Sequence, residues 1–312
     1  MKILVTGASG QVGSELVTAL ARKYGRDSVL ACDIRRMPDS DIQFEEADVR
    51  DRDGLGKIIR DNGVQKIFHL AALLSASGEK NPTLAFDVNL LGTWNVLTTA
   101  RDQGVKQVII PSTIGVFGPD TPKKNVPPTT IVRPRTMYGI TKYAAELLGD
   151  YFSSKFSLDC RGLRFPGLIS YLSPPGGGTT DYSIEMIVAA AHQEPYECFL
   201  REDTRLPMMY MQDAISSLID LSEADSSRLT RRTDYHVSSF SFTPKELEEE
   251  LHRHFPSFRV TYRPDFRQEI ADQWPESLDY SAASADWGFK PRFDFRHMVS
   301  DMISHLARPK VI

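Results

Sequence analysis

Short apolar runs rich in β-branched residues alternate with longer amphipathic stretches through the first 165 residues of the chain. Such alternation is typical of β-α-β units, which assemble into a parallel sheet with helices on both faces. We expect strands over residues 2–6, 28–32, 66–70, 107–111 and 159–164, and helices over residues 11–23, 53–61, 83–103 and 138–156. The pattern therefore predicts an α/β fold with a doubly wound parallel sheet.

The pattern changes after residue 165. A segment rich in Pro and Gly (residues 173–178) is followed by helix-like stretches and by short strands near residues 235–238 and 259–262. We expect residues 1–165, with segments that return to them, to form the sheet domain, and residues 166–312 to form mainly a smaller α/β lobe. The charged run at 245–254 predicts a helix with a solvated face.

Composition limits the classes of partner. The 312 residues are 41% hydrophobic and carry a formal net charge of −4, without a block of Lys and Arg that could follow a phosphate backbone. Nucleic acid is therefore a poor partner, and a small molecule is favoured. No apolar run reaches the ~18 residues that a membrane-spanning helix needs, which argues against a membrane partner. The sequence favours a cytoplasmic protein, with a removed organelle-targeting leader as the open alternative.

Metal ligands are not grouped in the sequence. Cys32, Cys160 and Cys198 lie far apart, which fits neither a disulfide framework nor a paired-thiolate site. His252 and His254 are two residues apart on an expected helix, so they point in different directions. We therefore expect no metal site.

Three glycines mark the turn after the first expected strand. Gly7, Gly10 and Gly13 enclose Gln11 and Val12 at the point where a helix should begin. The glycines permit a tight turn, close approach of a pyrophosphate to backbone amides, and close packing of the helix on the strand. This arrangement predicts dinucleotide binding by a Rossmann domain, in which the five residues contact the cofactor.

An acidic residue at the end of the second strand points to the type of dinucleotide. Asp33 follows Gly13 by twenty residues, where the Rossmann fold presents a carboxylate to the adenosine ribose and repels a 2′-phosphate. NAD is therefore the expected cofactor. Arg35 and Arg36 follow directly and leave NADP as the alternative.

A Tyr-Lys pair and a neighbouring Ser supply candidate catalytic groups. Tyr138 and Lys142 are four apart on an expected helix, so the ammonium can approach the phenol and lower its pKa. Ser112 follows a parallel strand, at the edge where such sheets bind ligands, and can bond the reacting oxygen. Together these residues predict proton transfer at an alcohol or a carbonyl, with Tyr138 as general base.

These motifs, in this order, resemble those of the extended short-chain dehydrogenase/reductase family. Within that family, several stretches are similar to the NAD-dependent L-threonine 3-dehydrogenases of short-chain type: residues 74–82, 111–114, 175–182, 206–211, 274–279 and 286–288. The resemblance covers nearly the whole chain. It implies oxidation of the β-hydroxyl of L-threonine by NAD to 2-amino-3-oxobutyrate and NADH.

The resemblance also implies roles for individual residues. Tyr138 would accept the hydroxyl proton as phenolate, Lys142 would hold the nicotinamide ribose, Ser112 would orient the reacting oxygen, and Thr113 would be a second contact. Asn89 matches a proton-relay position beside the cofactor, with a helix-surface Asn as the alternative. The further cofactor contacts that it implies are Ile34, Arg35, Asp48, Val49, Leu70, Ala71, Ala72 and Leu168. For Ala71 and Ala72, simple packing is the alternative.

The amino-acid end of a threonine substrate needs polar partners. Ser75, Thr179 and Thr180 lie in the matching stretches and are expected to bind it, with ordinary turn chemistry as the alternative. Asp181 fits an ammonium contact or a helix cap equally and is not assigned. The loop at 118–134 is either a flap beside the site or a solvated linker.

Two other functions stay open at this point. A nucleotide-sugar epimerase or dehydratase shares the cofactor domain and the Tyr138–Lys142 pair, and a non-catalytic NAD-binding regulator shares the fold. The resemblance further implies a homodimer that pairs the helices over residues 81–103 and 138–156.

Overall fold

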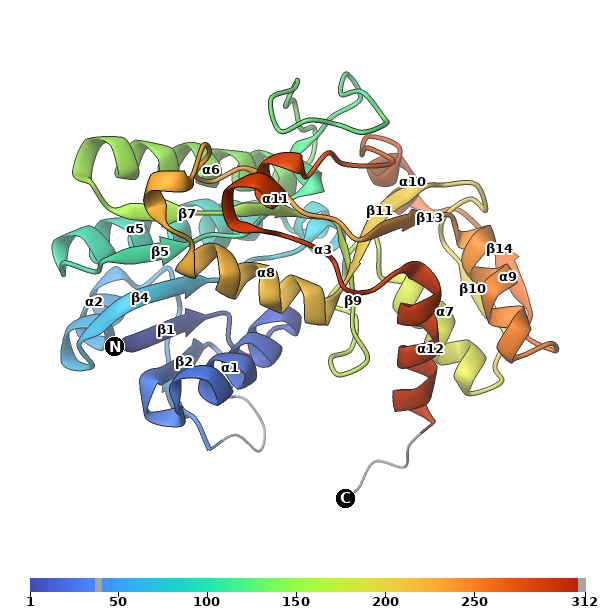
Figure 1. Ribbon diagram of the computed structural model, residues 1–312, viewed down its shortest axis with the longest axis horizontal. Coiled ribbons are helices and arrows are strands. Elements are labelled where there is room, and N and C mark those ends of the chain that lie inside the picture. Colours follow the sequence, from blue (N-terminus) through green and yellow to red (C-terminus); the bar gives the residue numbers. More distant parts are fainter. Residues whose placement is uncertain (37–40, 308–312) are drawn as a thin grey trace.

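The computed structural model describes residues 1–36 and 41–307. Its centre is a six-stranded parallel sheet in the order β3-β2-β1-β4-β5-β7 (Figure 1). The strands are β1 (Lys2–Thr6), β2 (Val29–Asp33), β3 (Gln43–Glu46), β4 (Val64–His69), β5 (Gln107–Ile109) and β7 (Asp159–Arg161). The chain winds outward in both directions from the β1–β4 pair, which confirms the doubly wound sheet.

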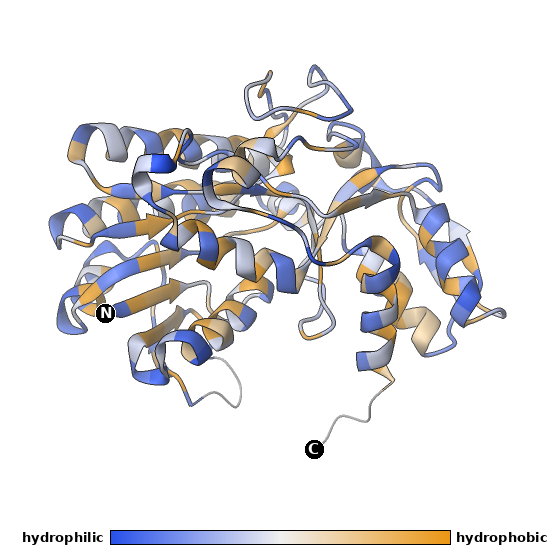
Figure 2. Ribbon diagram, in the orientation of Figure 1, coloured by the Kyte–Doolittle hydropathy of each residue, from blue (hydrophilic) through white to orange (hydrophobic). Residues whose placement is uncertain are grey.

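Helices cover both faces of this sheet. On β1, Ile3 and Val5 join one apolar cluster with α1 (Gln11–Tyr24) and α8 (Met211–Glu223), whereas Leu4 between them joins another with α2 (Arg52–Asp61) and α5 (Gly92–Asp102). Because neighbouring side chains on a strand point to opposite faces, a strand buried on both sides is apolar throughout. Figure 2 shows this apolar sheet between helices whose outer faces are polar.

Two expected elements are divided. The helix expected over 83–103 consists of α4 (Pro82–Phe86), a π-helical turn (Asp87–Leu91) and α5. The strand expected over 159–164 separates into β7 and β8 (Leu163–Phe165), which pairs with β6 (Ser112–Thr113) and β12 (Tyr235–His236) in another sheet. At the break, Gly162 N donates to Arg232 O instead of continuing the main sheet.

The C-terminal part of the chain adds smaller layers. Two sheets, β9-β11-β13 and β10-β14, pack with helices around a second apolar core. Their strands are β9 (Gly167–Ile169), β10 (Tyr196–Cys198), β11 (Leu206–Tyr210), β13 (Phe240–Phe242) and β14 (Val260–Tyr262), and the helices are α7 (Tyr182–Ala191), α9 (Pro244–His254), α10 (Phe266–Ala271), α11 (Ser281–Trp287) and α12 (Phe295–Leu306). Across residues 1–36 and 41–307, no helix combines the length and apolar character that crossing a bilayer requires.

The charged run expected to be a solvated helix face is only partly so. In α9, Glu248 and Glu250 are buried. The Glu248 carboxylate accepts hydrogen bonds from Tyr262 and Lys245, and Glu250 pairs with Arg253 and Arg296. The prediction was wrong for these two residues, because partners brought in by the fold permit their burial.

Candidate functional site

Two adjoining cavities lie at the carboxyl edge of the main sheet. The first, called here the β2-side cavity, has about 430 Å³ and borders the ends of β1, β2 and β4. The second, the α6-side cavity, has about 390 Å³ and reaches the start of α6 (Met137–Phe156). Gly7, Gly10, Leu70, Ala72 and Leu73 line both. Because the strand order reverses between β1 and β4, this is where open α/β sheets bind their ligands.

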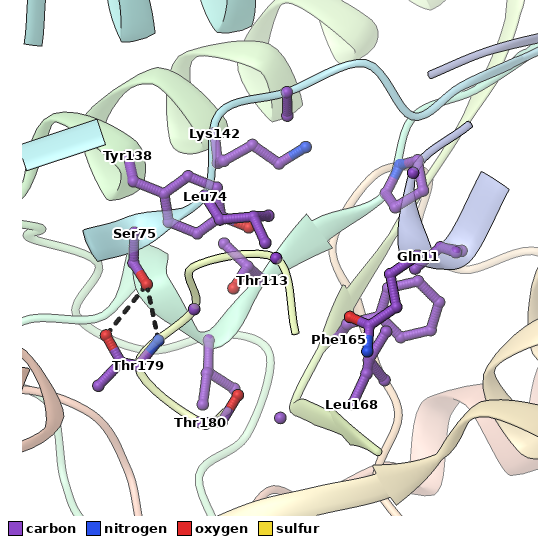
Figure 3. A pocket seen from close by; sticks show the side chains of 18 of the residues that line it. Gln11, Leu74, Ser75, Thr113, Tyr138, Lys142, Phe165, Leu168, Thr179 and Thr180 are labelled. Atoms are coloured by element: carbon purple, nitrogen blue, oxygen red, sulfur yellow. Dashed lines mark hydrogen bonds between the residues drawn. The ribbon is translucent and has the colours of Figure 1, made fainter. Parts of the chain in front are cut away.

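The glycine turn leaves room for a ligand at the start of α1. Gly7 has φ +70°, and a Cβ there would lie 2.5 Å from Ala71 N. Gly10 is the N-cap of α1 and provides no side-chain hydrogen bond to the first amides, which suits a phosphate group. Gln11, Val12 and Gly13 line the α6-side cavity, where Gln11 Nε2 is buried without a hydrogen-bond partner among the described residues (Figure 3).

The β2-side cavity collects the residues expected around an adenosine. Asp33 Oδ2 accepts a hydrogen bond of 3.0 Å from Ser9 N, which fixes the carboxylate at the cavity edge. The same cavity is lined by Ile34, Arg35, Asp48, Val49, Leu70, Ala71 and Ala72, and Leu168 lines the α6-side cavity. All expected cofactor contacts except Asn89 therefore border one of the two cavities.

Asn89 lies behind the cavity wall, not in it. Its Oδ1 accepts from Leu73 N at 2.8 Å, and its Nδ2 donates to Leu73 O at 3.0 Å and to Thr141 Oγ1 at 3.2 Å. Asn89 is buried in the π-helical turn, so the helix-surface alternative is wrong. The Asn89 amide thus bonds Leu73 and Thr141 and supports Leu73 in the cavity wall, whereas a direct contact with the cofactor was expected.

Tyr138 and Lys142 extend from the first turns of α6 into the α6-side cavity (Figure 3). The helix begins at Met137 because the Thr136 hydroxyl caps it, accepting from Gly139 N at 3.1 Å. Enclosure raises the pKa of the Tyr138 phenol, and its hydrogen bond with Thr113 partly opposes this. Burial lowers the pKa of Lys142 to about 8, against the attraction of Glu146.

The expected lowering of the Tyr138 pKa by Lys142 is thus not found. Both residues belong to the described part of the chain, and no hydrogen bond joins the ammonium to the phenol; the contact to Tyr138 comes from Thr113. Loss of solvation is therefore the largest influence on the pKa of the phenol.

Ser112 has a partner that the sequence analysis missed. Its hydroxyl donates a short hydrogen bond to Glu146 Oε1. The Arg164 guanidinium holds the same carboxylate with hydrogen bonds of 2.8 and 2.7 Å. Ser112 lines the cavity and its proton is directed to Glu146, so its hydroxyl oxygen would meet a reacting hydroxyl as an acceptor. The spacing of Glu146, four residues after Lys142, was the available signal.

Another part of the cavity wall joins α3 (Ser75–Lys80) to the Pro/Gly-rich segment. Ser75 Oγ lies 3.0 Å from Thr179 Oγ1 and accepts from Thr179 N at 3.2 Å (Figure 3). Thr180 lines the same wall, with Leu74 and Trp274, two apolar residues that sequence reasoning missed. The three residues expected to bind the amino-acid end therefore lie together in the lining of the cavity that Tyr138 also borders.

The Asp181 side chain lines the cavity and does not cap α7. Its Oδ2 accepts from Gly177 N at 2.8 Å and Gly178 N at 2.7 Å, which closes the glycine segment on itself. The helix-cap alternative is wrong, because the side chain makes no cap hydrogen bond to α7. Within the described residues, no group of three or more His, Cys, Asp and Glu side chains is placed to hold a metal ion.

Comparison with known proteins places this site in a family. Residues 3–232 match the model of the NAD dependent epimerase/dehydratase family. An uncharacterized epimerase/dehydratase of Staphylococcus haemolyticus is 45% identical over 307 residues, 97% of this chain and 96% of that protein.

Solved structures are equally similar. The GalE-like L-threonine dehydrogenase from Cupriavidus necator, in its holo form, has a TM-score of 0.96 and 43% identity, covering 98% of this chain and 100% of that one. A monomeric L-threonine 3-dehydrogenase from a metagenome has a TM-score of 0.95 and 46% identity, covering 97% and 98%. The resemblance seen in the sequence is confirmed, and the chain belongs to the NAD dependent epimerase/dehydratase family.

Proposed function

We propose that the chain is an NAD-dependent L-threonine 3-dehydrogenase that converts L-threonine to 2-amino-3-oxobutyrate and NADH. The observation that carries this proposal is the α6-side cavity. It is lined by Tyr138, Thr113 and Lys142 together with the hydrogen-bonded pair Ser75 and Thr179. The L-threonine dehydrogenase structures at 43–46% identity support the same substrate.

NAD fits the two cavities. The amides at the start of α1 suit its pyrophosphate, and Asp33 suits the hydroxyls of its adenosine ribose. A side chain at Gly7 would collide with the backbone of Leu70 and Ala71, so glycine is needed for this turn to take its shape beside both cavities. When bound, NAD supplies the hydride acceptor for the substrate Cβ.

The residues of the chain then carry out the proton transfer and bind the substrate. Tyr138 takes the proton of the β-hydroxyl as the C–H bond breaks and the carbonyl forms, and Thr113 holds the same oxygen. The Lys142 ammonium, which lines the same cavity, would hold the nicotinamide ribose. Ser75, Thr179 and Thr180 orient the amino-acid end, and Leu74 and Trp274 enclose its apolar part.

Nucleotide-sugar chemistry is the second candidate within the family. Its substrates carry a diphosphate, which proteins hold with several Arg or Lys groups. Among the described residues that line the α6-side cavity, Lys142 is the only Lys or Arg. This lining favours a small amino acid over a nucleotide sugar as the substrate. A regulator without activity would have no use for the Tyr138–Lys142 arrangement.

The proposal is tested by following NADH formation from NAD by chelator-treated enzyme. L-threonine is compared with L-serine, L-allo-threonine and a panel of nucleotide sugars. Reduction of NAD with L-threonine alone among these compounds supports the proposal and shows that the enzyme needs no metal. Turnover of a nucleotide sugar, with none of L-threonine, would reject it.

The choice of cofactor is expected to depend on Asp33. Replacing it with Ser removes a charge-assisted hydrogen bond to the ribose, so the KM for NAD should rise about tenfold or more. The KM for NADP should fall, because the carboxylate no longer repels the 2′-phosphate. Steady-state kinetics with both cofactors measure this. Asp61→Ser, on an exposed end of α2, is the control. If Asp33→Ser kept the wild-type preference for NAD over NADP, residues other than Asp33 would determine the choice of cofactor.

We further propose a homodimer formed through α4, α5 and α6. Exposed apolar side chains gather on these helices and on the π-helical turn between α4 and α5: Phe86, Leu91, Trp94, Ile140, Leu147, Tyr151 and Phe156. The helices α5 and α6 pack side by side, so a second copy can cover the group in a twofold bundle.

Leu147→Glu is expected to shift the protein from dimer to monomer in sedimentation velocity, since it buries a charge at the proposed interface. Ile131→Glu, at an exposed apolar residue of the loop before α6, should leave the mass unchanged. A monomeric wild type, as the name of the metagenome relative describes for that protein, would contradict the proposal.

A further inference from the structure

A buried ionic cluster lies directly behind the wall of the α6-side cavity. Ser112, Glu146, Arg164 and His236 are each at most 4% exposed. The two Glu146 oxygens accept three hydrogen bonds, one from Ser112 and two from Arg164. Only Ser112 among these four residues also lines the cavity, so it is the point where the cluster meets a ligand.

The cluster continues away from the cavity to the C-terminal part of the chain. Arg164 Nη1 lies 3.2 Å from Pro128 O and 3.2 Å from His236 Nε2, and His236 Nδ1 lies 3.0 Å from Val126 O. Burial lowers the pKa of His236 to about 3, so the ring is neutral. Nδ1–H then donates to Val126, and Nε2 accepts from Arg164. Val126 in turn bridges to Leu278.

Stability alone does not explain a buried ion pair of this kind. Removing Glu and Arg from water costs several kcal/mol per ion, and packed apolar residues often serve stability as well. The position of the pair indicates what else it does. Glu146 lies one helical turn after Lys142 and two turns after Tyr138 on α6. The ionic cluster therefore touches Ser112 and lies beside Lys142 on the helix that also carries Tyr138.

The hydrogen bond to Glu146 also determines what Ser112 can offer a ligand. A Ser hydroxyl has one proton and two acceptor lone pairs. Because its proton is donated to the carboxylate, the oxygen can only accept toward the cavity. The Thr113 oxygen accepts from Gly115 N at 3.1 Å, so its proton stays available toward Tyr138 and the cavity.

We propose that Glu146, held by Arg164, is a positioning residue of the active site, which fixes Ser112 as a hydrogen-bond acceptor and faces Lys142 with a negative charge. This inference rests on the proposed function. The charged groups around Glu146 are Arg164 on β8, Asp234 before β12, and Lys142 on α6 itself. Glu146 opposes the lowering of the Lys142 pKa, so its loss should lower that pKa further and reduce the charged fraction of Lys142 near neutral pH.

The test uses Glu146→Gln and the double variant Glu146→Gln/Arg164→Met, which removes the Arg164 charge together with that of Glu146. In the NAD-bound enzyme labelled with ¹⁵N-lysine, the Lys142 signal, assigned with Lys142→Arg, should titrate at lower pH in both variants. The kcat for L-threonine should fall about 10- to 100-fold, as expected for misplaced catalytic groups, with NAD affinity kept. The alkaline limb of kcat/KM should move to lower pH.

Ser112→Ala separates the two parts of the role. It should raise the KM for L-threonine but leave the Lys142 titration unchanged, because Glu146 and Arg164 remain paired. A double variant with wild-type Lys142 titration and wild-type kcat would show that the pair serves folding only and would overturn the inference. If wild type does not oxidise L-threonine, the proposed function fails, yet the Lys142 titration still decides whether Glu146 acts on it.

Discussion

Replacing Tyr138 with Phe is expected to lower the turnover of L-threonine by about 10³-fold, the size of a lost general base. The ring is kept, so the α6-side cavity retains its shape, and only the hydroxyl that bonds Thr113 is removed. NAD should still bind, because the residues of the β2-side cavity are unchanged. Stopped-flow NADH formation measures the turnover, and fluorescence titration with NADH measures cofactor binding.

Tyr151→Phe is the matched control, since it makes the same change on the exposed part of the same helix. It should leave both turnover and NADH affinity unaltered. Wild-type turnover in Tyr138→Phe would remove the phenol from the mechanism, while a loss of NADH affinity would assign Tyr138 to cofactor binding instead.

The fold was largely predictable because its signals are local. β1 lies where the first apolar run predicted it, and α1 begins at Gln11, directly after the glycine turn. The strand β3 was missed, since its residues Gln43–Glu46 are mostly polar and lie at the edge of the sheet. The division between β7 and β8 was missed because it depends on a contact between Gly162 and Arg232, 70 positions apart in sequence.

The membership of the site was predictable for the same reason, but its hydrogen bonds were not. All of the expected substrate contacts line the α6-side cavity. The proton of Ser112, however, is directed by Glu146 and Arg164, which come from a helix and a strand that meet only in the fold. Asp181 and Asn89 likewise bond backbone groups of loops whose course no periodicity reveals. Motif reasoning identifies which groups gather, and tertiary structure decides which of their donors and acceptors remain available.

Replacing Gly13 with Ala is expected to abolish NAD binding, because a Cβ at this position would lie 2.1 Å from Gly7 O and 2.8 Å from Ala8 Cα. Relief of that overlap must move the glycine turn away from α1 and destabilise the fold by about 1–3 kcal/mol.

Gly56→Ala supplies the comparison, since Gly56 is also inside a helix but its added Cβ meets only Thr99 Cγ2, at 3.6 Å. Ala is the better helix former, so this variant should gain up to about 1 kcal/mol and bind NADH as wild type does. Urea unfolding and NADH titration of the pair therefore separate helix propensity from the shape of the turn. If Gly13→Ala retained wild-type NADH affinity, the close approach of α1 to the turn would not be what positions the pyrophosphate, and the cofactor would have to be held chiefly by the β2-side cavity.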